Sequence, residues 1–163
     1  MNFLIAPNAF KGTIPAEEAA QIIADKIVEL PGSRCLIQPI ADGGDGTCGL
    51  LEASLGLKKV NLITLNAVGQ PIRGSFGWDD TNKKAYLDVS TASGIGTLES
   101  TQKKPDAAST FGTGMIIREA IRYGAEKIIL GLGGSATVDM GLGILGALWM
   151  KAVGKFLFSL PDF

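Results

Sequence analysis

Three segments of this chain share one layout, in which an apolar run is followed by a polar loop and then by a sequence with helical periodicity. The loops read APNAFKGT at residues 6–13, IADGGDGT at residues 40–47 and GLGGSATVD at residues 131–139. Alternating strands and helices are typical of a parallel sheet, in which strand ends and helix N-termini lie along one edge. We therefore expect an α/β fold in which the three loops converge on a single cleft.

The remaining segments predict further strands and helices around these units. Helical periodicity and turn residues predict helices over residues 16–30, 47–56 and 113–123 and after residue 139, with buried strands at 2–7, 35–40 and 127–132. Between residues 60 and 90, three short extended runs separated by turn-forming residues predict an antiparallel meander. Residues 90–109 are expected to form a long polar loop.

Composition favours a packed globular protein and excludes two classes of partner. Hydrophobic residues make up 46% of the chain and charged residues only 19%. A formal net charge of −1 provides no basic field for nucleic acid. The longest apolar run, residues 140–150, is well short of the roughly 20 residues that cross a bilayer, so we expect no membrane association. The two cysteines, Cys35 and Cys48, follow no signal peptide and lack metal-type spacing, which favours buried thiols in a reducing cytoplasm.

Because the chain has no histidine, any chemistry must rely on carboxylates, lysine, hydroxyls and backbone amides. Asp42 and Asp45 are candidates to hold Mg²⁺ or to accept a proton from an alcohol. Either could instead cap the following helix, and capping is the favoured interpretation for Asp45. Asp139 is either a first-turn partner of a helix dipole or a catalytic carboxylate. Lys11 is either a solvated lysine or a point charge for a carboxylate or a transferring phosphoryl group.

The glycines of the loops favour an anion site over a dinucleotide fold. Gly131, Gly133 and Ala136 fit the dinucleotide pattern, but no second strand ending in an acidic residue follows them. A cradle of backbone amides for phosphate or carboxylate oxygens fits better, with the hydroxyls of Ser135 and Thr137 as further donors. The competing interpretation is that the glycines only permit tight turns.

The stretches FLIAPNAFKGT, PIADGGDGT and GLGGSAT, the last followed two residues on by Asp139, resemble the type-1 glycerate kinase family in their order and spacing. The resemblance extends from Asn2 to about Val153. It implies ATP-dependent phosphorylation of glycerate, at the 2-hydroxyl in many bacterial members, with ATP and Mg²⁺ as cofactors. It also implies a cytoplasmic enzyme in which two α/β domains enclose a cleft.

Under this resemblance, the expected site residues fall into catalytic and binding groups. The catalytic candidates are Lys11, Asp42 and Asp139, with Asp42 also the candidate Mg²⁺ ligand. The candidates for binding substrate or nucleotide are Asn8, Gly43, Gly44, Asp45, Gly46, Thr47, Gly133, Gly134, Ser135 and Thr137. Asn8 and Asp45 stand where the family usually has Asp and Glu, and Val138 and Met140 replace the usual Asn and Gly beside Asp139.

Family members are more than twice as long, so we expect this chain to be the N-terminal portion of a truncated or frame-disrupted glycerate kinase. Residues 1–64 would then form part of a first α/β domain, incomplete without a C-terminal half, and residues 65–163 part of a second. The apolar ending KAVGKFLFSLPDF would leave an uncovered surface that favours self-association. The alternative to an active kinase is a non-catalytic remnant that binds anions or a protein partner.

Overall fold

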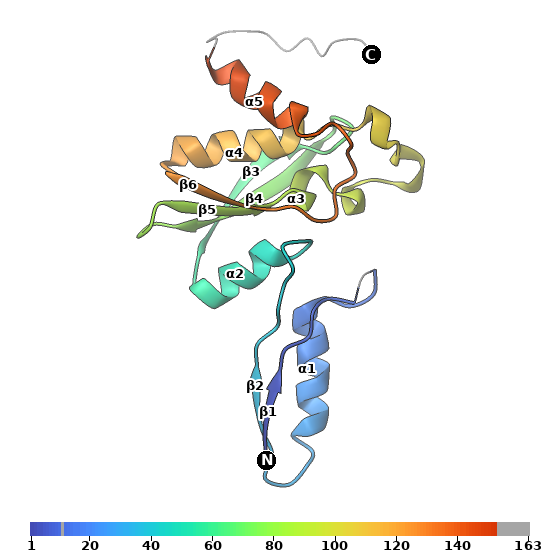
Figure 1. Cartoon of the computed structure of the whole chain (residues 1–163), viewed down its shortest axis with the longest axis vertical. Helices are drawn as coiled ribbons and strands as arrows, with labels where there is room; N and C mark the ends of the chain where they lie inside the picture. Colours follow the sequence, from blue (N-terminus) through green and yellow to red (C-terminus); the bar gives the residue numbers. More distant parts are fainter. Residues whose placement is uncertain (11, 153–163) are drawn as a thin grey trace.

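The computed structural model describes residues 1–10 and 12–152, which form two sheets with helices packed on them (Figure 1). The strands are β1 (Asn2–Ile5), β2 (Arg34–Ile37), β3 (Lys58–Leu65), β4 (Pro71–Asp79), β5 (Lys84–Asp88) and β6 (Lys127–Gly131). The α-helices are α1 (Ala16–Ile27), α2 (Thr47–Leu55), α3 (Ser90–Ser93), α4 (Phe111–Tyr123) and α5 (Leu142–Ala152).

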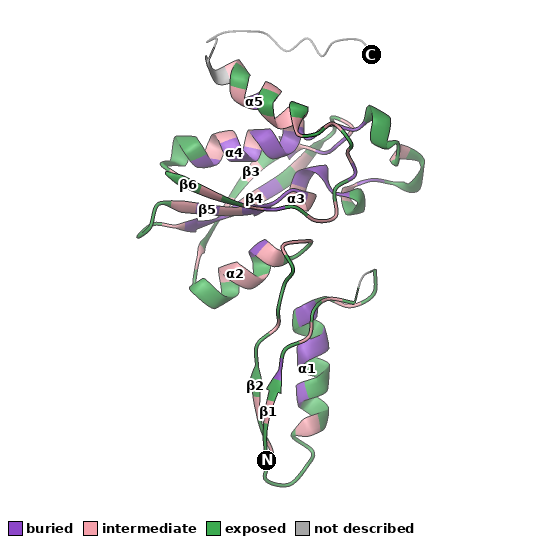
Figure 2. Cartoon of the chain, viewed as in Figure 1, coloured by how far each residue is buried: buried purple, intermediate pink, exposed green. Residues whose placement is uncertain are grey.

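The smaller sheet pairs β1 with β2 in parallel, in register from Asn2 opposite Arg34 to Ile5 opposite Ile37. Helix α1 covers this sheet with a face of alanines, which allow a close approach of helix to sheet. Ile5 packs against Ala20 and Ala24 in the small core between them. Burial in this unit is concentrated along α1, whereas much of the two strands is exposed (Figure 2).

The larger sheet has the order β3-β4-β5-β6, antiparallel across its first three strands and parallel between β5 and β6. Helices cover both faces. A Cβ at Gly74 would meet Ile116 of α4, while a Cβ at Gly77 would meet Glu52 of α2. Because side chains three residues apart on a strand point to opposite faces, α4 and α2 lie on opposite sides of the sheet, as Figure 1 shows. The main core lies between the sheet and α4, around Phe76.

The α/β class and the antiparallel meander are confirmed, but the arrangement of the parallel strands differs from the expectation. The three strands that precede the glycine loops do not share one sheet, because β1 and β2 form the smaller sheet and β6 belongs to the larger. The predicted division after residue 64 falls at the end of β3, which pairs along its whole length with β4. Within residues 90–109, the expected loop contains the short helix α3 and three 3₁₀ turns.

Within residues 1–10 and 12–152, no helix is long and apolar enough to span a bilayer. Residues 153–163, on which the prediction of self-association rests in part, lie outside the described residues.

Candidate functional site

The three loops line one cleft of about 980 Å³ between the smaller sheet with its helix α1 and the larger sheet with its helices. Its lining residues come from the loop after β1, the loop before α2 and the end of β6, with one more from the segment after α3. They are Asn8, Ala9, Phe10, Gly12, Thr13, Ile14, Pro15, Asp42, Gly43, Gly44, Asp45, Gly46, Ile95, Leu130, Leu132, Gly133 and Gly134. The loops therefore converge as expected, although they do so from two sheets.

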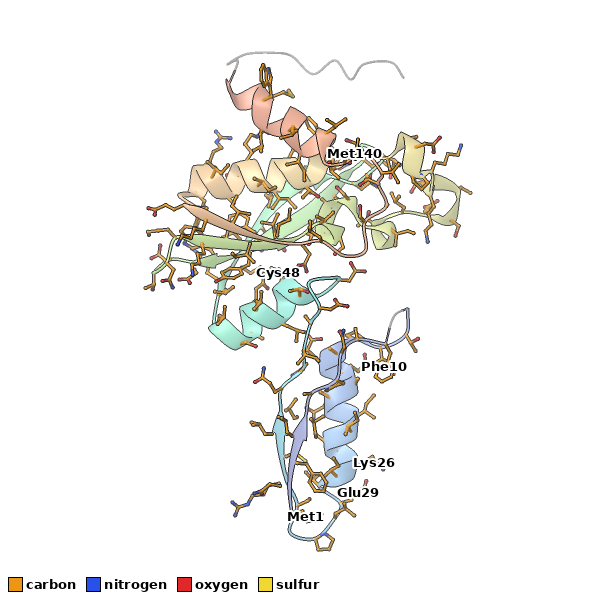
Figure 3. All side chains as sticks on the ribbon, in the orientation of Figure 1. Met1, Phe10, Lys26, Glu29, Cys48 and Met140 are labelled. Atoms are coloured by element: carbon orange, nitrogen blue, oxygen red, sulfur yellow. The ribbon has the colours of Figure 1, made fainter. Side chains whose placement is uncertain are left out.

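A backbone turn and a hydrogen bond to the second loop hold the first loop in place. Phe10 and Ile14 exchange backbone hydrogen bonds of 2.9 and 3.1 Å, which close a tight turn whose exposed Phe10 is labelled in Figure 3. The Ile40 amide donates to the Pro7 carbonyl at 3.0 Å, so the first and second loops leave their strands side by side. The Asn8 side-chain oxygen accepts from the Ala9 amide at 2.7 Å. Lys11 lies outside the described residues, and its role stays a prediction.

The second loop is a tight turn built around Asp42. Its carboxylate accepts a hydrogen bond from the Gly44 amide at 2.9 Å. The backbone at Gly43 and Gly46 has φ of 87° and 83°, which favours glycine at both positions. The Thr47 hydroxyl donates to the Gly44 carbonyl at 2.8 Å, so this candidate binding residue also closes the turn.

The capping role favoured for Asp45 is wrong, because another carboxylate occupies the start of α2. The N-cap of α2 is Gly46, which has no side chain. Both carboxylate oxygens of Asp88 accept a hydrogen bond from the Cys48 amide, at 3.0 and 3.2 Å. Asp45 instead directs its carboxylate toward the third loop, where a Cβ at Gly134 would overlap it.

The glycines of the second and third loops bring the two backbones into contact. A Cβ at Gly133 would overlap the Cα of Gly44, and a Cβ at Gly131 would lie 2.9 Å from the Gly43 carbonyl oxygen. These positions accept only glycine without a shift of the neighbouring backbone. Close packing between loops is therefore a role for Gly133 that operates whether or not an anion binds there.

Asp88 was missed by sequence reasoning, although an acidic residue directly after the apolar residues AYL of the short run KAYLD was a detectable signal. Only 4% of the residue is exposed. Burial raises the pKa of this carboxyl, while hydrogen bonds from the amides of Cys48 and Gly46 oppose the rise and the charges of Asp45 and Glu52 add to it. A buried carboxylate thus lies directly behind the second loop.

The hydroxyl residues of the third loop lie beside the cleft rather than in its lining. Ser135 and Thr137 share a hydroxyl hydrogen bond of 2.9 Å and line a smaller pocket of about 140 Å³ with Lys103. Ile95 lines both the pocket and the cleft, so the two spaces are neighbours.

Asp139 lies apart from the cleft lining, at the start of α5. Its carboxylate accepts from the Thr110 amide and hydroxyl, both at 2.8 Å, and from the amides of Gly141 and Gly143 at 3.2 and 3.1 Å. Although burial raises the pKa of this carboxyl, these hydrogen bonds outweigh it and hold the pKa below its usual value. The contacts favour the helix-terminus interpretation of Asp139 over the catalytic one.

The carboxylates that line the cleft suit a Mg²⁺ ion that binds together with a phosphate group of a substrate. Asp42 and Asp45 both line the cleft. In the described part of the chain, no three Asp, Glu, Cys or His side chains group together as a metal centre. Mg²⁺ is usually held by one or two carboxylates together with substrate phosphates and waters, so two carboxylates fit that mode.

Residues 3–157 match the family model described as the glycerate kinase family. The chain belongs to this family. It is 35% identical to a glycerate kinase of Bacillus subtilis (strain 168) over 149 residues, which cover 91% of this chain and 39% of that protein. It is 34% identical to a glycerate 2-kinase of Escherichia coli (strain K12), covering 93% of this chain and 40% of that protein.

A solved structure agrees with these sequence matches. The crystal structure of a protein provisionally described as glycerate kinase 2 of Salmonella typhimurium LT2 superposes with a TM-score of 0.72 at 33% identity. The match covers 91% of this chain and 40% of that one. The chain therefore spans about two fifths of the length of the relatives it matches, and its fold is part of a longer glycerate kinase fold.

Proposed function

We propose that this chain carries the phosphoryl-transfer site of a glycerate kinase, which moves a phosphoryl group from ATP to the 2-hydroxyl of D-glycerate. The observation that carries the proposal is the convergence of the three loops on one cleft in a member of this family. The 2-hydroxyl is favoured because the similar protein of E. coli is named a glycerate 2-kinase.

In this proposal the second loop carries the proton transfer. Asp42 lines the cleft and accepts the proton of the attacking hydroxyl, or else helps to hold the Mg²⁺ that accompanies ATP. Lys11 is assigned to neutralise the charge that develops on the transferring group, and Mg²⁺ would supply further positive charge there when bound. Asp45 is the second carboxylate available to the same ion.

Backbone groups and polar side chains would bind and orient the substrates. The amides of Gly43, Gly44, Gly133 and Gly134 are assigned to phosphate or carboxylate oxygens, because they belong to the loops that line the cleft. Asn8 and Gly46 border the same space, while Thr47 closes the second loop. The hydroxyls of Ser135 and Thr137 serve a ligand group that extends into the smaller pocket.

Asp139 is assigned to holding the third loop and the start of α5, since its hydrogen bonds to Thr110, Gly141 and Gly143 satisfy amides at two helix N-termini. It would act on the reaction only through the position of that loop.

A non-catalytic role is the second candidate, because the chain spans about two fifths of its relatives' length. The same cleft would then bind an anion or a protein partner without turnover. The kinase and an anion-binding remnant both predict binding of MgATP, a remnant that binds only a protein partner does not, and only the kinase predicts a product.

Phosphorus NMR of the 163-residue chain with MgATP and D-glycerate separates the two candidates. The kinase predicts a phosphoglycerate resonance that grows with time and is reduced in Lys11→Ala. ATP binding by calorimetry with no phosphoglycerate above the Lys11→Ala control would support the non-catalytic candidate and contradict the kinase.

A further inference from the structure

Among the residues that the structure describes, Asp88 is the one buried carboxylate of the larger sheet, and it contacts the second loop but takes no part in the proposed chemistry. It ends β5 and is 40 residues away in sequence from Cys48, whose amide it binds with both oxygens. The Gly46 amide also favours its charged form. Figure 3 labels Cys48, the residue on α2 at this junction. One carboxylate thus satisfies two of the unpaired amides at the start of α2.

The same carboxylate is enclosed by the end of β6. Asp88 pairs with Gly131 in the parallel register of β5 and β6, and the Val89 amide donates to the Gly131 carbonyl at 2.9 Å. A Cβ at Gly131 would overlap the carboxylate of Asp88 and also crowd the Gly43 carbonyl oxygen. The side chain therefore lies where β5, β6 and the second loop meet.

The charged side chains near Asp88 do not stabilise its negative charge. Asp45 and Glu52 are both acidic, so they disfavour the negative charge of the Asp88 carboxylate. Backbone amides are what stabilise the carboxylate, and two of them belong to Gly46 and Cys48 at the junction of loop and helix. Removing the carboxylate would leave these amides without their acceptor and would weaken the attachment of the loop to the larger sheet.

We propose that Asp88 is a positioning residue, which fixes the second loop against the larger sheet so that Asp42 and the loop amides face the cleft. The structural part of this proposal stands by itself, and its kinetic part rests on the proposed kinase function. The carboxylate touches no substrate and acts through the start of α2.

Amide hydrogen exchange by NMR tests the structural part without any need for activity. In Asp88→Asn, the Cys48 and Gly46 amides should exchange at least about tenfold faster, because they lose a charged acceptor. Amides of the β3–β4 pair should keep their protection. Asp88→Glu, which retains the carboxylate, should restore part of the protection, and Asp106→Asn, on an exposed turn, provides a control with the same loss of charge.

Steady-state kinetics tests the second part. The proposal predicts that Asp88→Asn lowers kcat by about tenfold or more with a smaller change in KM, and that Asp88→Glu recovers part of kcat. Unchanged exchange at Cys48 and Gly46, or an equal acceleration over the whole sheet, would overturn the positioning role. If the wild-type chain forms no phosphoglycerate, the kinase function fails, and the exchange pattern still decides whether Asp88 positions the loop.

Discussion

Replacing Asp139 with alanine distinguishes most sharply between the two roles that this residue was predicted to have. The carboxylate accepts hydrogen bonds from the Thr110 amide and hydroxyl and from the amides of Gly141 and Gly143. Thr110 in turn accepts a hydrogen bond from the Ile144 amide at its hydroxyl, at 3.1 Å. Asp139→Ala removes the acceptor that joins the starts of α4 and α5.

The expected loss of stability follows from these contacts. A hydrogen bond to a charged group contributes about 1.5–3 kcal/mol, and losses from one shared acceptor do not add. Asp139 is only partly buried, so solvent can replace some of its contacts. We therefore expect a loss of roughly 3 kcal/mol in the free energy of unfolding. For a protein of this length, that loss lowers Tm by about 6–12 °C.

Thermal unfolding followed by circular dichroism measures this change, with Asp106→Ala as the exposed control. Thr110→Val should also destabilise the chain. The Asp139→Ala/Thr110→Val double variant should lose less stability than the sum of the two single losses, because both remove the same hydrogen bond between the Thr110 hydroxyl and the Asp139 carboxylate. A Tm of Asp139→Ala equal to that of the control, combined with abolished phosphoryl transfer, would refute the structural role and restore the catalytic one.

Three further predictions follow from the same structure. Gly133→Ala should move the Gly44 backbone, because the new Cβ would overlap it. Amide resonances of both the second and the third loop should then shift in the NMR spectrum. Shifts confined to residue 133 would contradict the close contact of the two loops. Because the pKa of the Asp139 carboxyl is lower in the folded chain than its usual value, the charged carboxylate stabilises the fold at neutral pH. This contribution to the free energy of unfolding is lost as the pH falls below the usual pKa toward the lower pKa of the folded chain. Asp139→Asn should therefore reduce the decrease in the free energy of unfolding, measured with urea, between neutral pH and about pH 3. Burial raises the pKa of the Cys48 thiol to about 12. A thiol reagent at mildly alkaline pH should therefore modify Cys35 first and Cys48 only when the chain unfolds. Equal rates of modification at the two cysteines would contradict the burial of Cys48.

Local sequence signals predicted the elements well, because their causes lie within a few residues. The start of α2 at Thr47 follows from the glycine turn before it, and the end of α4 follows from Gly124, whose φ is 112°. The meander between β3 and β5 follows from short extended runs divided by turn residues. Each of these predictions needed only the residues that form the element.

The contacts that decide the roles of the site residues are long-range, and the sequence does not reveal them. Asp88 binds an amide 40 residues away, and Asp139 binds Thr110 at a separation of 29. For this reason, the roles of helix-dipole partner and catalytic carboxylate could not be separated for Asp139. Likewise, the contact of Gly133 with Gly44 joins two loops from different sheets, which no local pattern encodes.

Titration of the ¹⁵N-labelled chain with MgATP shows whether the three loops form one ligand site. The amides of Ala9, Gly44 and Gly133 each report on one loop of the cleft. If the loops act together, all three resonances shift along curves that give the same Kd, and Asp106→Asn leaves that Kd unchanged. Shifts in one loop alone, different Kd values for the three amides, or no shift at any of them would contradict a common site.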